Sequence, residues 1–435
     1  MLAVCGNKMA CAPLRPNILT GLRFTLRIGF GDCERGGYAW ASPTRGKTES
    51  QRLPSTDPNR VRGERMSELI GLDFIVDKSA WHKTRFVETE VSTDLAPGQV
   101  LFRVDRFAFT ANNISYAMAG DLLRYWYFFP KEEGWGCLPT MGFGDVIAST
   151  HDDVAVGTRC SGFFPMSRYL LIEPAAANPG SIVDGVAHRR ELAPVYNQYQ
   201  PVANDPLYSV EHEDVLALTR GLFTTAFLAE DFLADSDLYG AKSVLISSAS
   251  SKTSIALAFV VARRAQAKAV GLTSVAHLEF VKRLGFYDQV LTYDEIGALA
   301  DDPAVFVDMA GNTKVTRGVH EQLGANLKFS QRIGGTHWHA GGDDGDIPGP
   351  KREFFFAPAQ IKKRIVDWGP QGFQERLGAS LQAFIESSAK WLRVERGYGR
   401  EQVERVYGAT LEGSASPAQG NILSLWDDER SAAGR

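Results

Sequence analysis

The pattern of apolar and polar positions along the chain changes character near residue 211. Between residues 74 and 172, short segments alternate polar and apolar side chains, as half-buried strands do, and turns rich in Gly and Pro separate them. These segments are residues 84–91, 99–107, 142–149, 157–164 and 167–173. The pattern predicts an all-β lobe built as a small barrel.

From residue 211 onward, short apolar strands alternate with helices. The predicted helices are residues 214–228, 254–267, 277–284 and 315–323, and the predicted strands are residues 243–247, 268–272, 289–292, 304–308 and 326–333. Helices between apolar strands form right-handed βαβ units, so the fold class is α/β with a doubly wound parallel sheet. Residues 359–394 are predicted to be helical, and a last strand near 421–425 is expected to return to the first lobe.

Residues 175–210 join the two patterns and are predicted to be a long loop, because Pro174 directly before the segment and four prolines within it prevent long helices. So long a connection in an enzyme often shapes a binding site. The aromatic run at 125–129 is interpreted as a buried loop or edge; the alternative is one wall of an apolar substrate pocket.

Residues 1–65 lack a sustained apolar period, and Met66 begins a regular sequence, so we interpret the first segment as an upstream or disordered extension. The remaining chain divides into a β-rich catalytic lobe over 66–210, a nucleotide-binding domain over 211–358, and C-terminal helices with the returning strand over 359–435. A chain of 435 residues is too long for one hydrophobic core, which agrees with this division.

Composition narrows the class of protein. A net charge of -4 argues against nucleic-acid binding, which usually requires a basic stripe. No apolar stretch reaches 18 residues, so no membrane span is predicted. Five cysteines without a CxxC pair indicate neither a disulfide framework nor a structural zinc site, and they favour a cytoplasmic protein.

The clearest chemical signal is VLISSASSKTS at residues 244–254, which follows a strand and opens a helix. Small residues occupy the three positions of a G-x-G-x-x-G dinucleotide fingerprint: Ala249, Ser251 and Ser254. Serine and alanine suit helix–strand packing, whereas a left-handed turn without glycine is costly. The alternative interpretation is an ordinary serine-rich helix N-cap without a ligand.

Several groups in this loop suit an anion at a helix N-terminus. The hydroxyls of Ser250, Ser251 and Thr253 are potential phosphate donors, and Lys252 adds a positive charge. The second strand ends at the neutral Thr273 and Ser274, where an NAD-preferring dehydrogenase carries an acid that binds the ribose 2′-hydroxyl. We therefore expect NADP(H) as the cofactor.

Five segments resemble the medium-chain dehydrogenase/reductase superfamily, closest to its zinc-free quinone and enoyl reductase branches. They are LAPGQVLFRV at 95–104, FTANN at 109–113, GFYDQVLTY at 285–293, VDMAG at 307–311 and the block at 408–425. The chain also resembles the DUF2855 family, which carries this architecture. The resemblance implies a GroES-like barrel lobe, a Rossmann-type domain, a small-molecule substrate and a homodimer formed through an edge strand, for which 325–333 is the predicted edge.

The resemblance also assigns residues to the cofactor. The predicted cofactor-binding residues are Ser248, Ala249, Ser250, Ser251, Lys252, Thr253, Ser274, Tyr293, Gly311 and His337. The sequence departs from the family in its glycine-free loop and in Gly142-Phe-Gly144, which replaces the zinc-binding Gly-His-Glu motif. His337 and His339 lie two residues apart in a Gly- and Asp-rich run; we interpret the run as a solvated loop rather than a metal site, with His337 contacting cofactor or substrate.

The predicted activity is reduction of a carbonyl or an activated C=C bond by NADPH. The negative charge that develops on the substrate oxygen requires a hydrogen-bond donor, and the predicted catalytic residues are Asn112, Tyr116 and Tyr199. Tyr125, Tyr127 and Tyr196 are further candidates for this donor. Two alternatives stay open: a non-redox module that binds a nucleotide or acyl ligand, and a tailoring enzyme that acts on a thioester.

Overall fold

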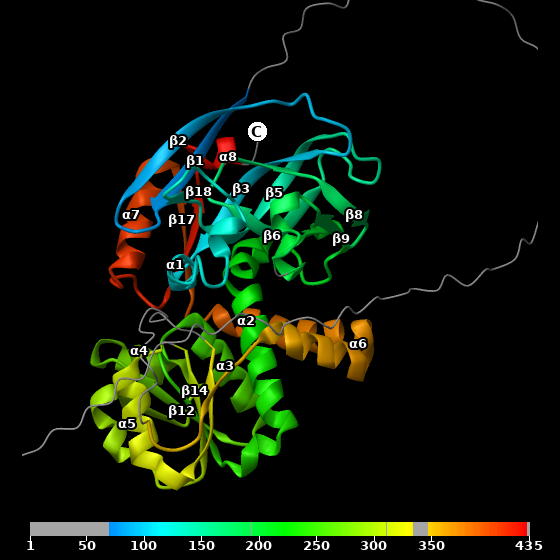
Figure 1. Cartoon of the computed structure of the whole chain (residues 1–435). Helices are drawn as coiled ribbons and strands as arrows, with labels where there is room; N and C mark the ends of the chain where they lie inside the picture. Colours follow the sequence, from blue (N-terminus) through cyan, green and yellow to red (C-terminus); the bar gives the residue numbers. More distant parts are fainter. Residues whose placement is uncertain (1–68, 193, 310, 334–346, 433–435) are drawn as a thin grey trace, which may run out of the picture. The chain divides into compact units, whose positions relative to one another are not determined.

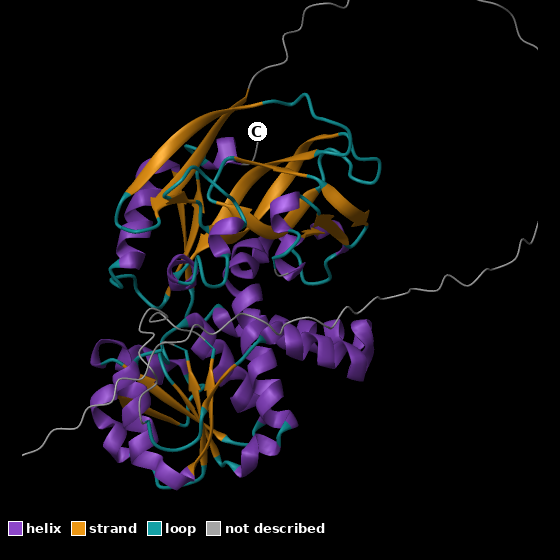
Figure 2. Cartoon of the chain, in the orientation of Figure 1, coloured by secondary structure: helices purple, strands orange, loops and turns teal. Residues whose placement is uncertain are grey.

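The computed structural model describes residues 69–432 except 193, 310 and 334–346 (Figure 1). The described chain forms a β-rich lobe and a parallel-sheet lobe with helices on both faces of the sheet, which confirms the predicted α/β class (Figure 2). None of the described helices is long and apolar enough to cross a membrane.

Antiparallel pairing dominates the β-rich lobe. A three-stranded sheet has the order β2-β1-β4, with β1 (Leu69–Asp77), β2 (Thr84–Val91) and β4 (Trp135–Gly136). A larger sheet has the order β17-β18-β3-β5-β6-β10-β9-β8, and β7 also pairs with β3. Its strands are β3 (Val100–Phe109), β5 (Pro139–Ser149), β6 (Arg159–Pro165), β7 (Tyr169–Ile172), β8 (Pro174–Asn178), β9 (Ser181–Asp184), β10 (Gln198–Pro201), β17 (Arg393–Tyr398) and β18 (Gln419–Ser424).

Aromatic side chains fill the interior of this lobe. Phe74, Phe102, Phe109 and Phe164 are fully buried. Two further helices complete the lobe, α1 (Ala111–Met118) and α7 (Gly399–Leu411), and the short α8 (Glu429–Ala432) follows β18. The Tyr407 hydroxyl of α7 donates to the Trp81 carbonyl oxygen at 2.7 Å, which anchors α7 on this core.

The segment at 175–210 was predicted to be a loop, and this prediction is wrong for part of it. It contains β9, β10 and most of β8. Prolines are compatible with these strands because Pro174 begins β8 and Pro201 ends β10, positions where a missing N–H interrupts little of the ladder. The helix predicted over 359–394 likewise ends earlier, because α6 (Ala357–Ser388) gives way to β17. The last strand, β18, pairs antiparallel with β3.

The second lobe is a six-stranded parallel sheet in the order β13-β12-β11-β14-β15-β16. Its strands are β11 (Ser243–Ile246), β12 (Lys268–Thr273), β13 (Gln289–Thr292), β14 (Ala304–Asp308), β15 (Leu327–Arg332) and β16 (Arg352–Phe354), and its connecting helices include α3 (Lys252–Arg264), α4 (Leu278–Leu284) and α5 (Thr313–Leu323). Alternate strand residues enter two separate cores, with Val244 on the α3 face and Leu245 on the α5 face. The loops at the carboxyl ends of these strands lie where ligands bind in such sheets.

The expected edge strand at 325–333 is not an edge. β15 pairs with β14 on one side and with β16 on the other, so β16 ends the sheet. The sequence missed β16 because only three residues form it. The predicted homodimer stays a prediction.

Helix α2 (Glu213–Asp235) contacts elements of both lobes. It packs against β3 and β5 of the β-rich lobe and against α3 of the parallel-sheet lobe. It also packs on α6, where the Arg364 guanidinium donates to Asp231 at 2.6 Å. α6 bends at Gly369, whose φ of 72° is left-handed, just before Pro370.

A buried charge cluster fixes the N-terminus of α2 to the β-rich lobe. Arg159 of β6 donates to Glu213 of α2 through Nε at 2.7 Å and through Nη2 at 2.9 Å, and to Asp145 of β5 at 2.8 Å. Arg159 also contacts Asp105 of β3, which Arg106 shares at 3.0 Å. Negative side chains in the first turn of a helix interact favourably with its dipole, so the cluster also suits α2 itself.

We expect Arg159→Met to destabilise the fold strongly, because it leaves the Asp105 and Glu213 carboxylates buried without their main partner. Breaking a buried ion pair from one side typically costs about 3–5 kcal/mol. Urea unfolding followed by circular dichroism measures the loss. Lys242→Met is the matched control, since its exposed pair with Asp302 at 3.8 Å should contribute about 1 kcal/mol or less. Equal stability of the two variants would contradict the role given to the cluster.

Candidate functional site

The loop between β11 and α3 lies at the carboxyl edge of the parallel sheet. Ser248 has a φ of 49°, in the left-handed region that favours glycine. The left-handed turn expected for the fingerprint, which is costly without glycine, therefore falls one residue before Ala249. Ser251 caps α3, because its side chain accepts a hydrogen bond from the Ser254 amide at 3.2 Å. The N-terminus of a 13-residue helix therefore faces this loop.

Hydroxyl groups hold the loop together from inside. Ser254 Oγ donates to the Ser247 carbonyl oxygen at 2.9 Å and accepts from Ser251 Oγ at 2.8 Å. Ser247 Oγ donates to Asp308 of β14 at 2.9 Å. Ser254 is fully buried, so its hydroxyl fills space between helix and strand where the fingerprint has its third glycine.

The neighbouring strand supplies a glycine that the loop lacks. A Cβ on Gly271 of β12 would lie 2.9 Å from the Ala249 Cβ and 2.9 Å from the Tyr287 ring. The Tyr287 hydroxyl donates to the Ala249 carbonyl oxygen at 2.9 Å. Ala249 thus occupies a fingerprint position because the residue facing it on β12 has no side chain.

Lys252 does not point to the loop hydroxyls. Its ammonium donates to the backbone carbonyl oxygen of Gln419 in β18 at 2.6 Å. Burial lowers the pKa of Lys252 to about 8, and no carboxylate contributes to that shift. The lysine therefore places a weakly held positive charge between the first turn of α3 and the β-rich lobe.

The carboxyl end of β12 carries an unsatisfied hydroxyl. Thr273 is 1% exposed, and its Oγ1 has no hydrogen-bond partner among the residues that the structure describes. Ser274 follows and is the N-cap residue of η7 (Val275–His277). The Nδ1 atom of the His277 ring lies 2.9 Å from Ser250 Oγ in the loop after β11. Tyr293 begins η8 (Tyr293–Ala298) directly after β13. These hydroxyl and imidazole groups share one edge of the sheet with the loop between β11 and α3 (residues 247–251), which is the candidate phosphate loop.

The turn after β14 completes this edge. Asp308 is buried and accepts hydrogen bonds from the Gly311 amide at 3.0 Å and from Thr316 Oγ1 at 3.2 Å. Gly311 has a φ of 70°, a conformation that its missing side chain permits. His337, the remaining predicted cofactor residue, lies outside the described residues.

In the β-rich lobe, three tyrosines gather around the end of α1. The rings of Tyr116 and Tyr125 stack with centroids 4.3 Å apart, and the Tyr196 ring stacks on Phe163 at 4.5 Å. The Tyr196 hydroxyl lies close enough to the Tyr116 and Tyr125 hydroxyls to raise their pKa values, and Asn112 lies close enough to Tyr116 to act on its pKa. Burial raises the pKa of Tyr116 and of Tyr125 well above the usual range, so both stay protonated and able to donate at neutral pH.

Tyr199 has a different environment from these tyrosines. It is fully buried, and its hydroxyl accepts from Arg189 at 2.8 Å and donates to the Phe163 carbonyl oxygen at 3.2 Å. Its ring packs between Phe102 and Phe164. The structure thus places Tyr199 in the core of the lobe with its hydroxyl bonded inside the protein, and we do not include it in the proposed site.

One hydrogen bond joins the two groups of residues. Asn421 of β18 pairs with Phe109 of β3, two residues before α1 begins. Gln419, two residues earlier in β18, accepts the hydrogen bond from Lys252 at the start of α3. Strand β18 therefore contacts both the start of α3 and the strand that leads into α1, and we propose that the two groups of residues form one site.

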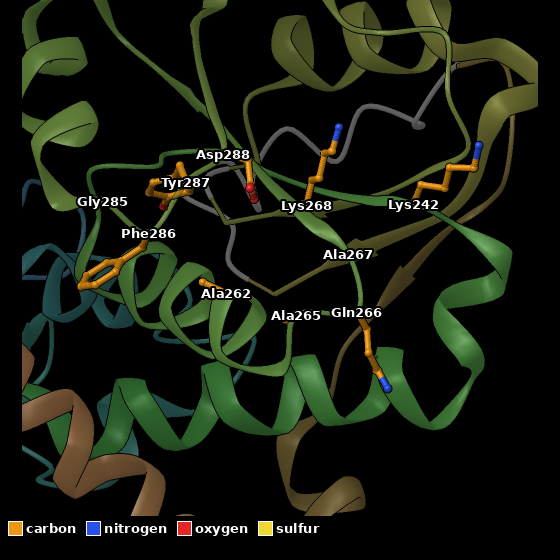
Figure 3. A pocket seen from close by; sticks show the side chains of 10 residues that line it. All are labelled: Lys242, Ala262, Ala265, Gln266, Ala267, Lys268, Gly285, Phe286, Tyr287 and Asp288. Carbon is orange, nitrogen blue, oxygen red and sulfur yellow. The ribbon is translucent and has the colours of Figure 1, made fainter.

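An open hollow of about 390 Å³ lies at the opposite edge of the parallel sheet. Figure 3 shows it bordered by the turn after α3, with Ala265 and Gln266, and by the segment from Gly285 to Asp288. Lys242 and Lys268 stand at the amino ends of β11 and β12, away from the phosphate loop. The hollow is therefore separate from the candidate site.

Sequence reasoning missed two participants, His277 and Gly271, and did not predict that two of its candidates, Tyr125 and Tyr196, lie together. His277 was only the start of a predicted helix, although its place four residues after Thr273 at the end of the second strand was a usable signal. Gly271 had no signal, because the clash it avoids depends on the pairing of β11 with β12. Tyr125 and Tyr196 were candidates, but their separation in sequence concealed their contact.

Comparisons with known proteins place this geometry in a wider context. A profile of DUF2855, described as a protein of unknown function, matches residues 107–416. No curated protein matches the sequence. CurA from Vibrio vulnificus, solved in complex with NADPH, is similar with 13% identity and a TM-score of 0.53 over 82% of this chain and 100% of its own.

Two further solved structures are similar. TarJ from S. aureus in complex with NADPH has 11% identity and a TM-score of 0.50 over 83% of this chain and 100% of its own. A mutant enoyl thioester reductase from Candida tropicalis has 11% identity and a TM-score of 0.48 over 82% of this chain and 100% of its own. At these identities the likeness to CurA and TarJ shows the fold alone, which has a GroES-like lobe and a Rossmann-type domain.

The compensation between Ala249 and Gly271 can be tested by exchange. We expect Gly271→Ala to destabilise the protein by about 1–3 kcal/mol, because overpacking forces the loop or the Tyr287 ring to shift. Adding Ala249→Gly should recover part of the loss, since it removes one of the two contacts. Thermal unfolding of both single variants and the double variant measures the coupling. Strictly additive effects would contradict a direct contact between these positions.

Proposed function

The chain belongs to the DUF2855 family, and we propose that it is an NADP(H)-dependent, zinc-independent oxidoreductase that reduces a carbonyl or an activated C=C bond of a small apolar substrate. The observation that carries the proposal is the carboxyl edge of the parallel sheet. There a helix N-terminus, a hydroxyl-rich loop and a strand end without a carboxylate come together, as binding of a phosphorylated dinucleotide requires.

The residues at this edge fit NADP(H). The N-terminal amides of α3, with the hydroxyls of Ser251 and Thr253, would hold the pyrophosphate. Thr273, whose buried hydroxyl lacks a partner, and Ser274 would face the adenosine ribose, and Tyr293 would border it at the end of β13. Two solved proteins of this fold, CurA and TarJ, contain NADPH, which supports the same cofactor here.

The tyrosine cluster supports an apolar substrate with one polar oxygen. Exposed apolar side chains border the cluster at Leu122, Leu123, Tyr127 and Val195. The Arg124 guanidinium pairs with the Glu191 carboxylate at 3.1 Å, which joins the segment that carries Leu122, Leu123 and Tyr127 to the one that leads to Val195. Apolar walls with a few convergent polar groups are typical of small-molecule sites.

In the mechanism that we propose, this chain orients the substrate and the cofactor and stabilises the negative charge that develops on the substrate oxygen. When bound, the nicotinamide supplies the hydride. Tyr116, kept protonated by burial, would donate a hydrogen bond and then a proton to the substrate oxygen as negative charge develops there. Asn112 and Tyr196 would hold the Tyr116 hydroxyl in position, and Tyr196 would connect it to Tyr125.

Zinc independence is part of the proposal because Gly142-Phe-Gly144 contains no metal ligand where the resemblance would place one. Gly142 and Gly144 lie instead in the middle of β5, where the carbonyl oxygens of Arg106 and Arg103 leave no room for a Cβ. Their backbone packing accounts for both glycines without a role in catalysis.

One observation favours a second candidate function, a module that binds a nucleotide or acyl ligand without redox chemistry. The hydroxyls of Ser251 and Ser254 already bond within the protein, and the Lys252 ammonium already bonds to Gln419. NADPH consumption with enones, quinones or aldehydes separates the candidates, because a binding module would bind without turnover.

Cofactor affinity should depend on pH through Lys252. Below about pH 8 its ammonium is charged and favours the anionic cofactor, and above that pH the charge is lost, so the affinity should fall. Fluorescence titration of NADPH between pH 6.5 and 9.5 measures the dissociation constant. Lys252→Met should weaken binding at neutral pH by about tenfold and remove the decline above pH 8.

Lys242→Met is the control for this titration, because Lys242 is exposed at the other edge of the sheet and should leave the binding unchanged. Wild-type affinity in Lys252→Met at pH 7 would contradict a role for this charge. Absence of NADPH binding to the wild-type chain at every pH would overturn the proposed function.

Two tyrosine variants separate catalysis from structure. With any substrate that is turned over, Tyr116→Phe should lower kcat by about 10²–10⁴ while NADPH affinity is retained, because only the proton donor is lost. Tyr199→Phe should retain kcat within a few-fold but lower the unfolding temperature, since Arg189 loses a buried partner. Steady-state kinetics and thermal unfolding of both variants check this. Full turnover in Tyr116→Phe would remove it from the mechanism.

A further inference from the structure

His277 bridges the ends of two neighbouring strands at the candidate cofactor site. It closes η7, which follows β12, and its Nδ1 lies 2.9 Å from Ser250 Oγ in the loop that follows β11. The ring is half-buried, so one side contacts the protein while the Nε2 side has no hydrogen bond within the described chain. The bridge spans the two loops between which a dinucleotide places its pyrophosphate and adenosine ribose.

The surroundings of this bridge suit a phosphate rather than a free ribose hydroxyl. The strand end offers neutral hydroxyl groups from Thr273 and Ser274, and the Thr273 hydroxyl is buried without a partner. A site that grips a ribose 2′-hydroxyl needs a carboxylate acceptor, whereas one that binds a 2′-phosphate needs donors and positive charge. His277 is the residue at this strand end that can supply both.

We propose that His277 is the specificity-determining residue for the cofactor, and that its protonation sets a preference for NADPH over NADH that strengthens as the pH falls. This inference rests on the proposed function, because it assumes that a dinucleotide occupies the edge of the sheet. It adds a residue and a regulatory property that the proposal does not contain.

The chemistry follows from the bond to Ser250. When the imidazole is neutral with Nδ1 unprotonated, Nδ1 accepts the only proton of the Ser250 hydroxyl, so this hydroxyl cannot donate to a phosphate. When the imidazole is protonated, Nδ1–H donates to Ser250 Oγ, and the hydroxyl proton becomes available. Protonation also leaves Nε2–H as a charged donor. One proton therefore frees the Ser250 hydroxyl as a donor for a 2′-phosphate and adds a positive charge to the Nε2–H donor that was already present.

Charged groups on the surrounding elements do not replace this switch. On α4, Lys282 pairs with Glu279 at 3.4 Å, and at the start of α3 the Lys252 ammonium is turned to Gln419. On η8, Glu295 accepts from the backbone and side chain of Thr292 at 2.8 and 2.9 Å, and Asp294 is exposed to solvent. Charging of His277 is thus the local change that a 2′-phosphate would sense.

The test compares two ligands that differ only in the 2′-phosphate. Dissociation constants of NADP⁺ and NAD⁺ for the full chain are measured by calorimetry between pH 6.5 and 8.5. The ratio of the two dissociation constants cancels the effect of Lys252, because Lys252 is in the first turn of α3 and would act on the pyrophosphate, which both ligands contain. We expect the preference for NADP⁺ to rise about tenfold as the pH falls across this range, the size of one charge-assisted contact.

Two variants assign the effect to His277. In His277→Gln the ratio should stay low and nearly flat, apart from titration of the 2′-phosphate itself near pH 6. In His277→Lys, which keeps a positive charge, the preference for NADP⁺ should stay high throughout.

A ratio that does not change with pH in the wild type, or that changes equally in His277→Gln, overturns this inference while the proposed function stands. If neither ligand binds the wild-type chain at any pH, the proposed function fails, and this inference fails with it.

Discussion

The close approach of α3 to the ends of β11 and β12 is the constraint on which the rest of the structure depends. In a dinucleotide-binding fold, glycines usually provide this closeness. Here the small side chains of Ser251 and Ser254 bond to each other and to the Ser247 carbonyl oxygen, and Gly271 on the neighbouring strand makes room for Ala249. The helix N-terminus consequently stays at the carboxyl edge of the sheet, although the fingerprint has no glycine.

That position of α3 also connects the two halves of the site. Lys252, in the first turn of the helix, reaches β18, and β18 lies beside β3, which leads into α1 with Asn112 and Tyr116. In the β-rich lobe, Arg159 of β6 binds Glu213 at the N-terminus of α2 and Asp145 of β5, and so fixes α2 to this lobe. Separate buried polar contacts thus join α3 to β18 and α2 to the β-rich lobe. Such contacts specify one arrangement more strictly than apolar packing does.

Five of the six strands of the parallel sheet were predictable from the sequence to within a residue or so, because each of them is a short apolar run bounded by a helix or a turn, whereas β16 was missed. The predicted limits of β13 and β14 coincide with the observed ones. The antiparallel strands after residue 173 were not predictable in this way, since their prolines occupy strand ends that pattern reading takes for loops. The existence of the phosphate loop was predictable, but the direction of Lys252 was not, because its partner lies 167 residues away in the chain.

The central claim is that a dinucleotide binds across the loops after β11 and β12. Hydrogen–deuterium exchange of the full chain with and without NADPH tests it most directly. The account predicts slower exchange in residues 247–256 and 273–278 when NADPH is present, with little change around the hollow at 262–268. Unchanged exchange in both loops at saturating NADPH, or protection confined to the hollow, would contradict the account.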